Sequence, residues 1–358
     1  MVNIRDVAAR AAVAPMTVSR VLNNPDAVSV DTRKRVEEAI ADLHYVPNMV
    51  GQGLRKRRTM VLGLVVSDIT NPFAVQQIQG VTKAARAAGY TVIFAHTEHS
   101  ADEELHQLRS LIERRVDGVL LSPVYNTPDS VEFVQRQRRP IAVLGYDMAG
   151  LDVDVVRCDT DAAARSLTEF LIDLGHRSIA MLSGSENIVT AVERARGYTR
   201  AMTEAGLGVR ITYGRFTPES GYEMAMSALR APERPTALVT ASNFIALGAA
   251  EAASALGLRV PEDLSITTFD NARTDLVHDP FFTGIVQPVA EMASAGTDMV
   301  IERASGQVAG PGRDRIFPTT FEVHRSTAPP SREPASSRAP SSAATRRGHH
   351  NEVKGSQQ

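Results

Sequence analysis

Seven short apolar runs, separated by helical stretches, constrain the fold of this chain more than any other feature. They are VLGLVV (61–66), YTVIFA (90–95), GVLLS (118–122), PIAVLG (140–145), SIAMLSG (178–184), TALVTAS (236–242) and LSITTFD (264–270). Near-continuous apolar runs are typical of strands buried on both faces, and their alternation with amphipathic helices predicts parallel sheets covered by helices. We expect two such α/β halves, with a break near Val156–Thr160.

The first 58 residues show a helical pattern instead of strands. In the first helix, apolar residues follow the helical period from Ile4 to Ala11, and Asn3 is placed to cap it. The second helix lies in VAPMTVSRVLNN (13–24), and the third in VDTRKRVEEAIADL, with Ser29 as its cap. No helix of this length buries its apolar stripe alone, so we expect the three to pack into one small core.

The second helix has an apolar face and a polar face. Val18 and Val21 lie on the apolar side, whereas Met16, Arg20 and Asn23 share the other. Only residues 12–14, approximately, separate it from the first helix, which is the turn length of a helix-turn-helix. In that motif the second helix enters the major groove of DNA. The same pattern is also typical of an ordinary three-helix bundle with arginine on its outside.

If the motif is a helix-turn-helix, the polar face contacts DNA. Arg20 has the donors to bind a guanine, Thr17 and Ser19 reach phosphate or base, and Met16 packs on a thymine methyl group. The charge distribution agrees, because residues 1–58 carry +4 and residues 327–358 carry +3 on a chain of net charge -2. A basic head on an acidic body is expected when only the head binds a polyanion.

The N-terminal sequence resembles a known family of regulators. IRDVAARAAVAPMTVSRVLNN and VSVDTRKRVEEAIADLHYVPN are similar to the DNA-binding domain of lac-repressor (LacI/GalR) transcription regulators. The resemblance implies a helix-turn-helix headpiece at 1–46 and a hinge at 47–59, with Pro15 and Met16 largely setting operator preference. Ala14 departs from the serine cap usual in the family, and a lost cap costs about 1 kcal/mol. Pro15 offsets part of that cost through its fixed φ.

In this family the hinge folds into a short helix on operator DNA, and a leucine matching Leu54 wedges into the minor groove. The resemblance implies hinge contacts from Asn48, Val50, Leu54 and Arg55. Gly51 and Gly53 depart from the family pattern, and each weakens a helix by about 1 kcal/mol. We therefore expect a hinge that is harder to order. The alternative is a flexible basic linker that binds phosphates only.

Residues 60–326 resemble the two-lobed, periplasmic-binding-protein-like body of the same family, with two Rossmann-like subdomains and an effector in the cleft between them. The resemblance implies lobes at about 60–158 and 159–284, with the chain recrossing after residue 284. Ligands of open α/β sheets bind at the carboxyl ends of strands. The implied effector contacts are Asn71, Phe73, Asp159, Arg194, Phe216, Ser242 and Asp270. Arg194 matches an arginine aimed at the effector, Phe216 an aromatic that stacks on it, and Asp270 an acid that accepts its hydrogen bonds. Alternatively, the two phenylalanines are core residues, and Arg194 and Asp270 form an ion pair that bridges the lobes.

Two departures bear on the effector class. Sugar-binding members often carry an acid at the position of Gly145 and an asparagine at that of Ser242. Their loss weakens the prediction of a simple hexose and leaves a pentose, a nucleoside or a modified sugar. We expect a repressor that binds a near-palindromic operator as a homodimer, because a single headpiece makes too few contacts for tight binding. The alternative is a DNA-binding regulator whose degenerate pocket does not respond to ligand.

Other functional classes fit the sequence poorly. The chain has no P-loop, G-x-G-x-x-G, H-E-x-x-H or G-x-S-x-G motif, so neither an enzyme nor a bound cofactor or metal is predicted. A solute receptor for a transporter would need a secretory signal and no basic head. Cys158 is the only cysteine and is expected to be a buried filler, and a cytoplasmic protein that does not enter the membrane is expected. Residues 327–358, rich in Pro, Ser, Ala and Arg, are expected to be a disordered tail.

Overall fold

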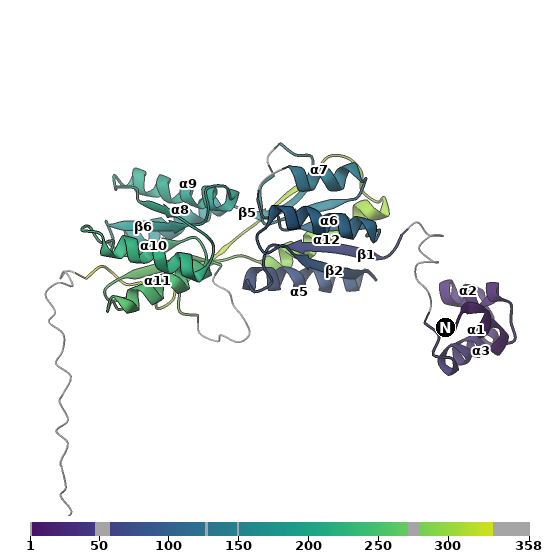
Figure 1. Cartoon of the computed structure of the whole chain (residues 1–358). Helices are drawn as coiled ribbons and strands as arrows, with labels where there is room; N and C mark the ends of the chain where they lie inside the picture. Colours follow the sequence, from purple (N-terminus) through teal and green to yellow (C-terminus); the bar gives the residue numbers. More distant parts are fainter. Residues whose placement is uncertain (1, 47–57, 126–127, 149, 271–279, 332–358) are drawn as a thin grey trace, which may run out of the picture. The chain divides into compact units, whose positions relative to one another are not determined.

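The computed structural model describes residues 2–46, 58–125, 128–148, 150–270 and 280–331 (Figure 1). The chain divides into two compact units, Met1–Val156 with Val289–Asp314, and Arg157–Pro288 with the chain from Arg315 onward. We call residues 2–46 the headpiece, the sheet-bearing remainder of the first unit the N-lobe, and the second unit the C-lobe. The chain passes between the units three times, so each lobe is assembled from separate stretches of sequence.

The headpiece consists of α1 (Ile4–Arg10), α2 (Pro15–Asn23), a 3-10 turn η1 (Pro25–Ala27) and α3 (Val30–Asp42). Asn3 caps α1 by accepting the N–H of Arg5 at 2.8 Å, and Ser29 caps α3, so both predicted caps are confirmed. The helices share a small core of Val7, Ala8, Ala11, Val18, Val21, Val36 and Ala39. Every residue packed against this core also comes from the headpiece.

The N-lobe contains a six-stranded sheet in the order β11-β5-β4-β3-β1-β2. Its strands are β1 (Val61–Val66), β2 (Thr91–His96), β3 (Gly118–Leu121), β4 (Ile141–Leu144), β5 (Asp154–Cys158) and β11 (Asp314–Phe317). Strands β1 to β5 run parallel. Helices α5 (Pro72–Ala87) and α12 (Val289–Ser305) pack together on one face, and α6 (Ala101–Glu113) and α7 (Asp129–Arg136) on the other.

The C-lobe repeats this plan with the sheet order β12-β10-β9-β8-β6-β7. Its strands are β6 (Ile179–Ser183), β7 (Ile211–Tyr213), β8 (Ala237–Thr240), β9 (Ser265–Phe269), β10 (Thr283–Val286) and β12 (Thr320–Glu322). Only β12 runs antiparallel to its neighbour among the pairings of this sheet. Helices α8 (Thr160–Asp173) and α9 (Val189–Glu204) cover one face, and α10 (Pro218–Arg230) and α11 (Asn243–Ala255) the other (Figure 1).

All seven strands predicted from apolar runs are confirmed, and the central ones are buried along their whole length. Strands β5, β7, β10, β11 and β12 were not predicted, because they are short or carry charged residues, as in DVVRC and DRIF. In the described part of the chain, no helix is both long and apolar enough to traverse a bilayer.

Candidate functional site

Helix α2 begins without a side-chain cap. Ala14 occupies the cap position, and Pro15 is the first helical residue. This confirms the arrangement predicted from the sequence, in which the fixed φ of proline offsets part of the lost cap. Val18 and Val21 are buried in the headpiece core, so the opposite side of α2 faces solvent.

The solvent side of α2 carries the side chains predicted to contact DNA. Pro15, Met16 and Arg20 are exposed, and Thr17 and Ser19 are half-buried beside them. The Arg20 side chain makes no hydrogen bond or ion pair with any residue that the structure describes, so its guanidinium donors remain available. The exposed Asn23 donates from Nδ2 to the Ser19 carbonyl at 2.6 Å, which leaves its Oδ1 as an acceptor.

Several of the other headpiece cations are neutralised inside the headpiece. Three ion pairs lie there: Arg10–Asp42 at 2.6 Å, Arg33–Glu37 at 2.7 Å and Arg35–Asp31 at 3.9 Å. Within the described residues, Arg5, Arg20 and Lys34 have no such partner. Arg5, Arg20 and Lys34 are therefore the headpiece cations whose charge is not offset by an ion pair within the described residues.

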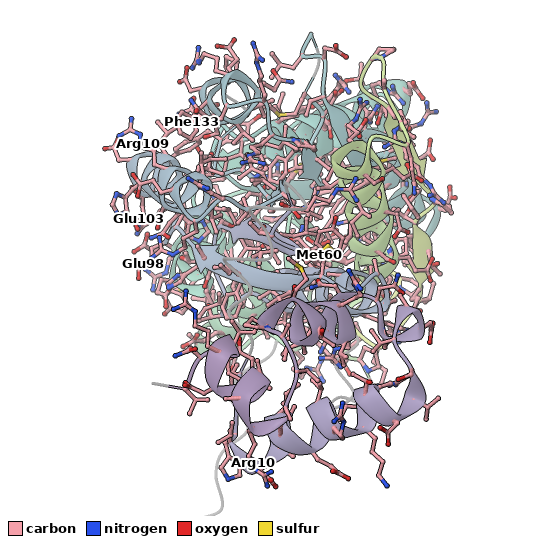
Figure 2. The ribbon with its side chains drawn as sticks, turned by 90° about the vertical axis from the view of Figure 1, so that its right-hand side faces the viewer. Arg10, Met60, Glu98, Glu103, Arg109 and Phe133 are labelled. Atoms are coloured by element: carbon pink, nitrogen blue, oxygen red, sulfur yellow. The ribbon has the colours of Figure 1, made fainter. Side chains whose placement is uncertain are left out.

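The chain is anchored to the N-lobe directly after the hinge. Asp117, buried before β3, accepts the N–H of Thr59 at 2.8 Å and that of Met60 at 2.9 Å (Met60 is labelled in Figure 2). The Thr59 hydroxyl donates to the Arg115 carbonyl at 2.9 Å. The end of the hinge is therefore fixed to the sheet. The predicted hinge contacts lie outside the described residues: Asn48, Val50, Leu54 and Arg55.

The predicted N-lobe contacts lie at the carboxyl ends of β1 and β4. Asn71 is the N-cap of α5 and accepts the N–H of Phe73 at 2.9 Å. The Phe73 ring lies beside Gly145, where a Cβ would be 3.4 Å from Cζ of the ring. Gly145 has φ +86°, a left-handed conformation that favours glycine. Because β3 lies between β1 and β4, the Phe73 ring reaches across the carboxyl end of β3.

Arg194 is buried in the second turn of α9. Its Nη1 donates to the Ala241 carbonyl and lies 3.5 Å from Oδ2 of Asp270. The guanidinium carbon is 4.2 Å from the centroid of the Phe269 ring. The Nε atom is buried and has no hydrogen-bond partner among the described atoms. The described residues supply no acceptor for this N–H donor.

Asp270 directly follows β9 and has φ +59°, a left-handed conformation uncommon outside glycine. Its Oδ1 accepts a hydrogen bond from Nε2 of Gln287, which directly follows β10. Arg194, Asp270 and Gln287 thus form one network at the carboxyl ends of neighbouring strands. The ion pair considered from the sequence exists, but both of its members belong to the C-lobe.

Gln287 was missed by the sequence analysis. The available signal was its place directly after the apolar run TGIV, because ligand-contacting side chains gather where parallel strands end. The carbonyl of Ala241, directly after β8, and the ring of Phe269 were missed as well, since neither a backbone group nor a buried aromatic shows in a residue pattern.

The other predicted C-lobe residues have local structural roles. The half-buried Phe216 ring packs on Gly184, directly after β6, where a Cβ would collide with the ring. Ser242 is buried and caps α11 by accepting a first-turn N–H at 3.3 Å. Asp159 is exposed and caps α8 in the same way at 2.9 Å. These capping bonds account for Ser242 and Asp159 without a ligand.

Cys158, at the end of β5, is a buried thiol. Burial raises the pKa of this thiol to about 12, and the nearby Asp270 carboxylate adds to the shift. The thiolate required for nucleophilic attack is therefore absent at neutral pH, which agrees with the predicted filler role. Among the described residues, no cluster of three or more His, Cys, Asp or Glu is placed to hold a metal ion.

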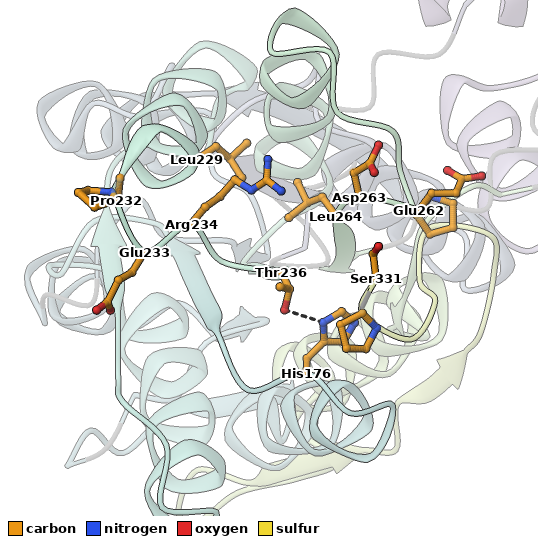
Figure 3. Close-up of a pocket in the computed structure, with 13 residues that line it drawn as sticks. His176, Leu229, Pro232, Glu233, Arg234, Thr236, Glu262, Asp263, Leu264 and Ser331 are labelled. Carbon is orange, nitrogen blue, oxygen red and sulfur yellow. Dashed lines mark hydrogen bonds between the residues drawn. The ribbon is translucent and has the colours of Figure 1, made fainter. Parts of the chain in front are cut away.

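A separate pocket of about 500 Å³ lies at the amino ends of β8 and β9 in the C-lobe, opposite the carboxyl ends described above (Figure 3). His176, at its base, is buried, with Nδ1 2.8 Å from Oγ1 of Thr236 and Nε2 2.9 Å from the Ala328 carbonyl. A carbonyl only accepts, so Nε2 carries the proton. Burial lowers the pKa of His176, which favours the neutral ring. His176 therefore joins the segment after β12 to the sheet.

Two family models match the chain. Residues 3–48 match bacterial regulatory proteins of the lacI family, and residues 59–308 match the periplasmic binding proteins and sugar binding domain of the LacI family. Catabolite control protein A of Priestia megaterium is 35% identical over 297 residues, which cover 82% of this chain and 90% of that protein.

Two solved structures are similar over 91% of this chain. One is the lac repressor dimer bound to operator and the anti-inducer ONPF, with a TM-score of 0.80, 27% identity and 99% of its chain covered. The other is the complex of the transcriptional regulator CelR with cellobiose, with a TM-score of 0.69, 30% identity and 100% of its chain covered.

Proposed function

Because the chain belongs to the LacI family of bacterial transcription regulators, we propose that it represses transcription from an operator under the control of a small-molecule effector. Like its relatives, it is a DNA-binding regulator and not an enzyme. It acts in the bacterial cytoplasm as a homodimer that places two α2 helices on a near-palindromic operator. The similar lac repressor binds its operator as a dimer. Symmetric pairing multiplies the few contacts that a single headpiece makes.

The exposed side of α2 carries this proposal. Arg20 and Met16 project from a helix whose other side is locked into the headpiece core, which is the arrangement that a major-groove helix requires. Arg20 donates two hydrogen bonds to a guanine, Met16 packs on a thymine methyl group, and Pro15 helps to set base preference. Thr17, Ser19 and Asn23 contact phosphates or base edges beside them.

Operator binding is tested with Arg20→Ala. A preferred duplex is first selected from a random pool with the full-length protein. Losing a bidentate guanine contact costs about 1–3 kcal/mol, so the affinity for that duplex falls about 5- to 150-fold, whereas binding to random duplex changes little. Arg33→Ala is the matched control, since Arg33 is also exposed but is paired with Glu37. Unchanged preference in Arg20→Ala would refute the assignment of α2 to the major groove.

We propose that the effector contacts the C-lobe network of Arg194, Asp270 and Gln287. Asn71 and Phe73 of the N-lobe stay predicted effector contacts. A hydroxyl group accepts from one donor and donates to one acceptor, so two adjacent hydroxyls fit Arg194 Nε, which has no described partner, and the Asp270 carboxylate. An unsatisfied buried donor costs about 1–3 kcal/mol, which the bound hydroxyl removes. Phe216 stacks on the ligand ring. We therefore propose a sugar or the ribose part of a nucleoside as effector.

A thermal-shift screen of sugars and nucleosides tests the effector class. Cellobiose belongs in it, because the similar regulator CelR binds that disaccharide. A compound that stabilises the protein should no longer do so in Asp270→Ala, and operator affinity without the compound should stay unchanged. If no sugar or nucleoside stabilises the protein, the alternative of a ligand-unresponsive regulator holds, and the Arg194–Asp270–Gln287 network is then purely structural.

Effector binding acts as a two-state switch. The two states of the body differ in affinity for the effector, and the hinge, anchored at Thr59, couples them to the headpieces. Coupling of this kind is typically about 1–3 kcal/mol, or about 5- to 150-fold in operator affinity. Titrating the effector into the selected operator complex measures its sign and size.

A further inference from the structure

Glu104 is a buried carboxylate in the first turn of α6, and its hydrogen bonds go to residues outside its own helix. It is 3% exposed. Its Oε2 accepts the N–H of Val124 at 2.6 Å, and its Oε1 accepts the hydroxyl of Ser130 at 2.5 Å. Burial raises the pKa of Glu104, while both hydrogen bonds favour the charged form. A charge this deeply buried is costly unless its bonds compensate, so the contact is specific.

The two bonds span the connection between β3 and α7. Val124 lies shortly after β3, and Ser130 lies in the first turn of α7. One carboxylate therefore fixes both ends of the connection. A second contact holds the two helices together, because the guanidinium of Arg109 on α6 lies 5.9 Å from the ring centroid of Phe133 on α7 (Figure 2). A loss of Glu104 thus acts mainly on the connection and less on the helix pair.

The start of this connection lies next to the predicted N-lobe contacts. Ser122 directly follows β3 and donates its N–H to the Val65 carbonyl on β1 at 2.9 Å. Phe73 follows β1, and its ring lies beside Gly145 at the end of β4, so it extends past the carboxyl end of β3, which lies between these two strands. Tyr125, half-buried, is the aromatic residue of this stretch. Residues 122–125 therefore share the edge of the sheet with Phe73.

We propose that Glu104 is a positioning residue that holds residues 122–125 at the carboxyl end of β3 as part of the N-lobe surface that contacts the effector. The inference rests on the proposed effector function, and it adds Glu104, Ser130 and Tyr125 to the residues on which effector binding depends. Glu104 acts through its bonds to Val124 and Ser130, and not by touching the ligand.

The natural absence of tryptophan makes the position of this segment measurable. In a full-length Tyr125→Trp protein, the single indole reports on residues 122–125. Glu104→Gln places an amide NH2 against one of two donors and so breaks one of the bonds. We expect quenching of the indole by acrylamide to rise in Glu104→Gln and in Ser130→Ala, with unchanged far-ultraviolet circular dichroism. The matched control is Glu103→Gln (Glu103 is labelled in Figure 2), since the Glu103 carboxylate accepts a hydrogen bond only from Gln107, within α6, among the described residues.

Quenching equal to that of the parent protein in both Glu104→Gln and Ser130→Ala would overturn the proposal. If Glu104→Gln does not fold, Ser130→Ala alone decides, because it removes one donor and keeps the carboxylate. An equal rise in Glu103→Gln would also overturn it, since any change in helix charge would then suffice.

Effector affinity is measured in the same proteins with cellobiose and ribose, read from the indole emission. Loss of one hydrogen bond of the positioning carboxylate should weaken binding by about 5- to 10-fold in Glu104→Gln. Unchanged affinity there would refute the positioning role even if quenching rises. If neither sugar stabilises the wild-type protein in the thermal-shift screen, the sugar class proposed above is wrong for these two compounds, and the quenching comparison still decides whether Glu104 holds the segment.

Discussion

Replacing Asp154 with asparagine tests how strongly one ion cluster stabilises the N-lobe. Asp154 lies on β5 and is fully buried. Arg303 of α12 donates to it from Nε at 2.6 Å and from Nη2 at 2.8 Å, and Arg313 donates from Nη2 at 2.9 Å and from its backbone N–H at 2.9 Å. The cluster joins β5 to α12 and to the segment before β11, two pieces of chain that return to the lobe late in the sequence.

The size of the effect follows from the pKa of Asp154. Burial by itself would raise this pKa, but the bonds and charges of Arg303 and Arg313 outweigh it and lower the pKa from 3.8 to about 2. A difference of about 1.8 pKa units between the unfolded and folded states corresponds to about 2.4 kcal/mol. Because the folded-state pKa is the lower one, this stability is present above pH 4 and is lost as the pH falls from about 4 toward 2.

Urea unfolding of the full-length protein, followed by circular dichroism between pH 7 and pH 2.5, measures this contribution. At pH 7, Asp154→Asn should be less stable than the wild type by about 2 kcal/mol, since two partly buried guanidinium groups lose the counter-charge that they share. The difference should shrink below pH 4. Asp102→Asn, an exposed acid on α6, controls for the loss of a charge. A difference that is small at pH 7, or that stays constant to pH 2.5, would refute the reasoning.

Three further predictions concern the headpiece and the thiol. Ala14→Ser supplies the missing cap of α2 and should raise the free energy of unfolding of the headpiece, measured by calorimetry, by about 1 kcal/mol. An unchanged unfolding free energy would contradict the cap argument. Lys34→Gln should lower the slope of log operator affinity against log salt by about 0.9, and Arg33→Gln by less, because Arg33 is already paired. Cys158 should resist iodoacetamide at pH 8 in the native protein and react after unfolding; rapid native labelling would contradict its burial.

The fold was predictable where a sequence pattern is typical of only one structural element. Continuous apolar runs identified the central strands, and the caps of α1 and α3 were visible as Asn3 and Ser29 before helical periods. Strand β5 was hidden, since Asp154 interrupts its apolar pattern. That aspartate is tolerated in the interior because Arg303 and Arg313, each about 150 residues away in sequence, bind and neutralise it.

The site was harder to predict, because capping and ligand binding use the same residue types at the same places. A polar residue between a strand and a helix can cap the helix or face a ligand, and Asn71, Asp159 and Ser242 all cap helices here. Asp270 was identifiable from its position after β9, but its left-handed backbone and its bond to Gln287 depend on tertiary structure. A sequence does not show which residues at the carboxyl ends of neighbouring strands are joined by a hydrogen bond.

The threefold passage of the chain between its units sets an order for biosynthesis. The headpiece, complete by residue 46, leaves the ribosome first, and its core needs nothing that follows. Both lobes must wait, since the N-lobe lacks α12 and β11 and the C-lobe lacks β12 until the last stretch before residue 331 is translated. A message truncated near codon 288 would therefore yield a polypeptide with a complete headpiece but without a complete N-lobe or C-lobe.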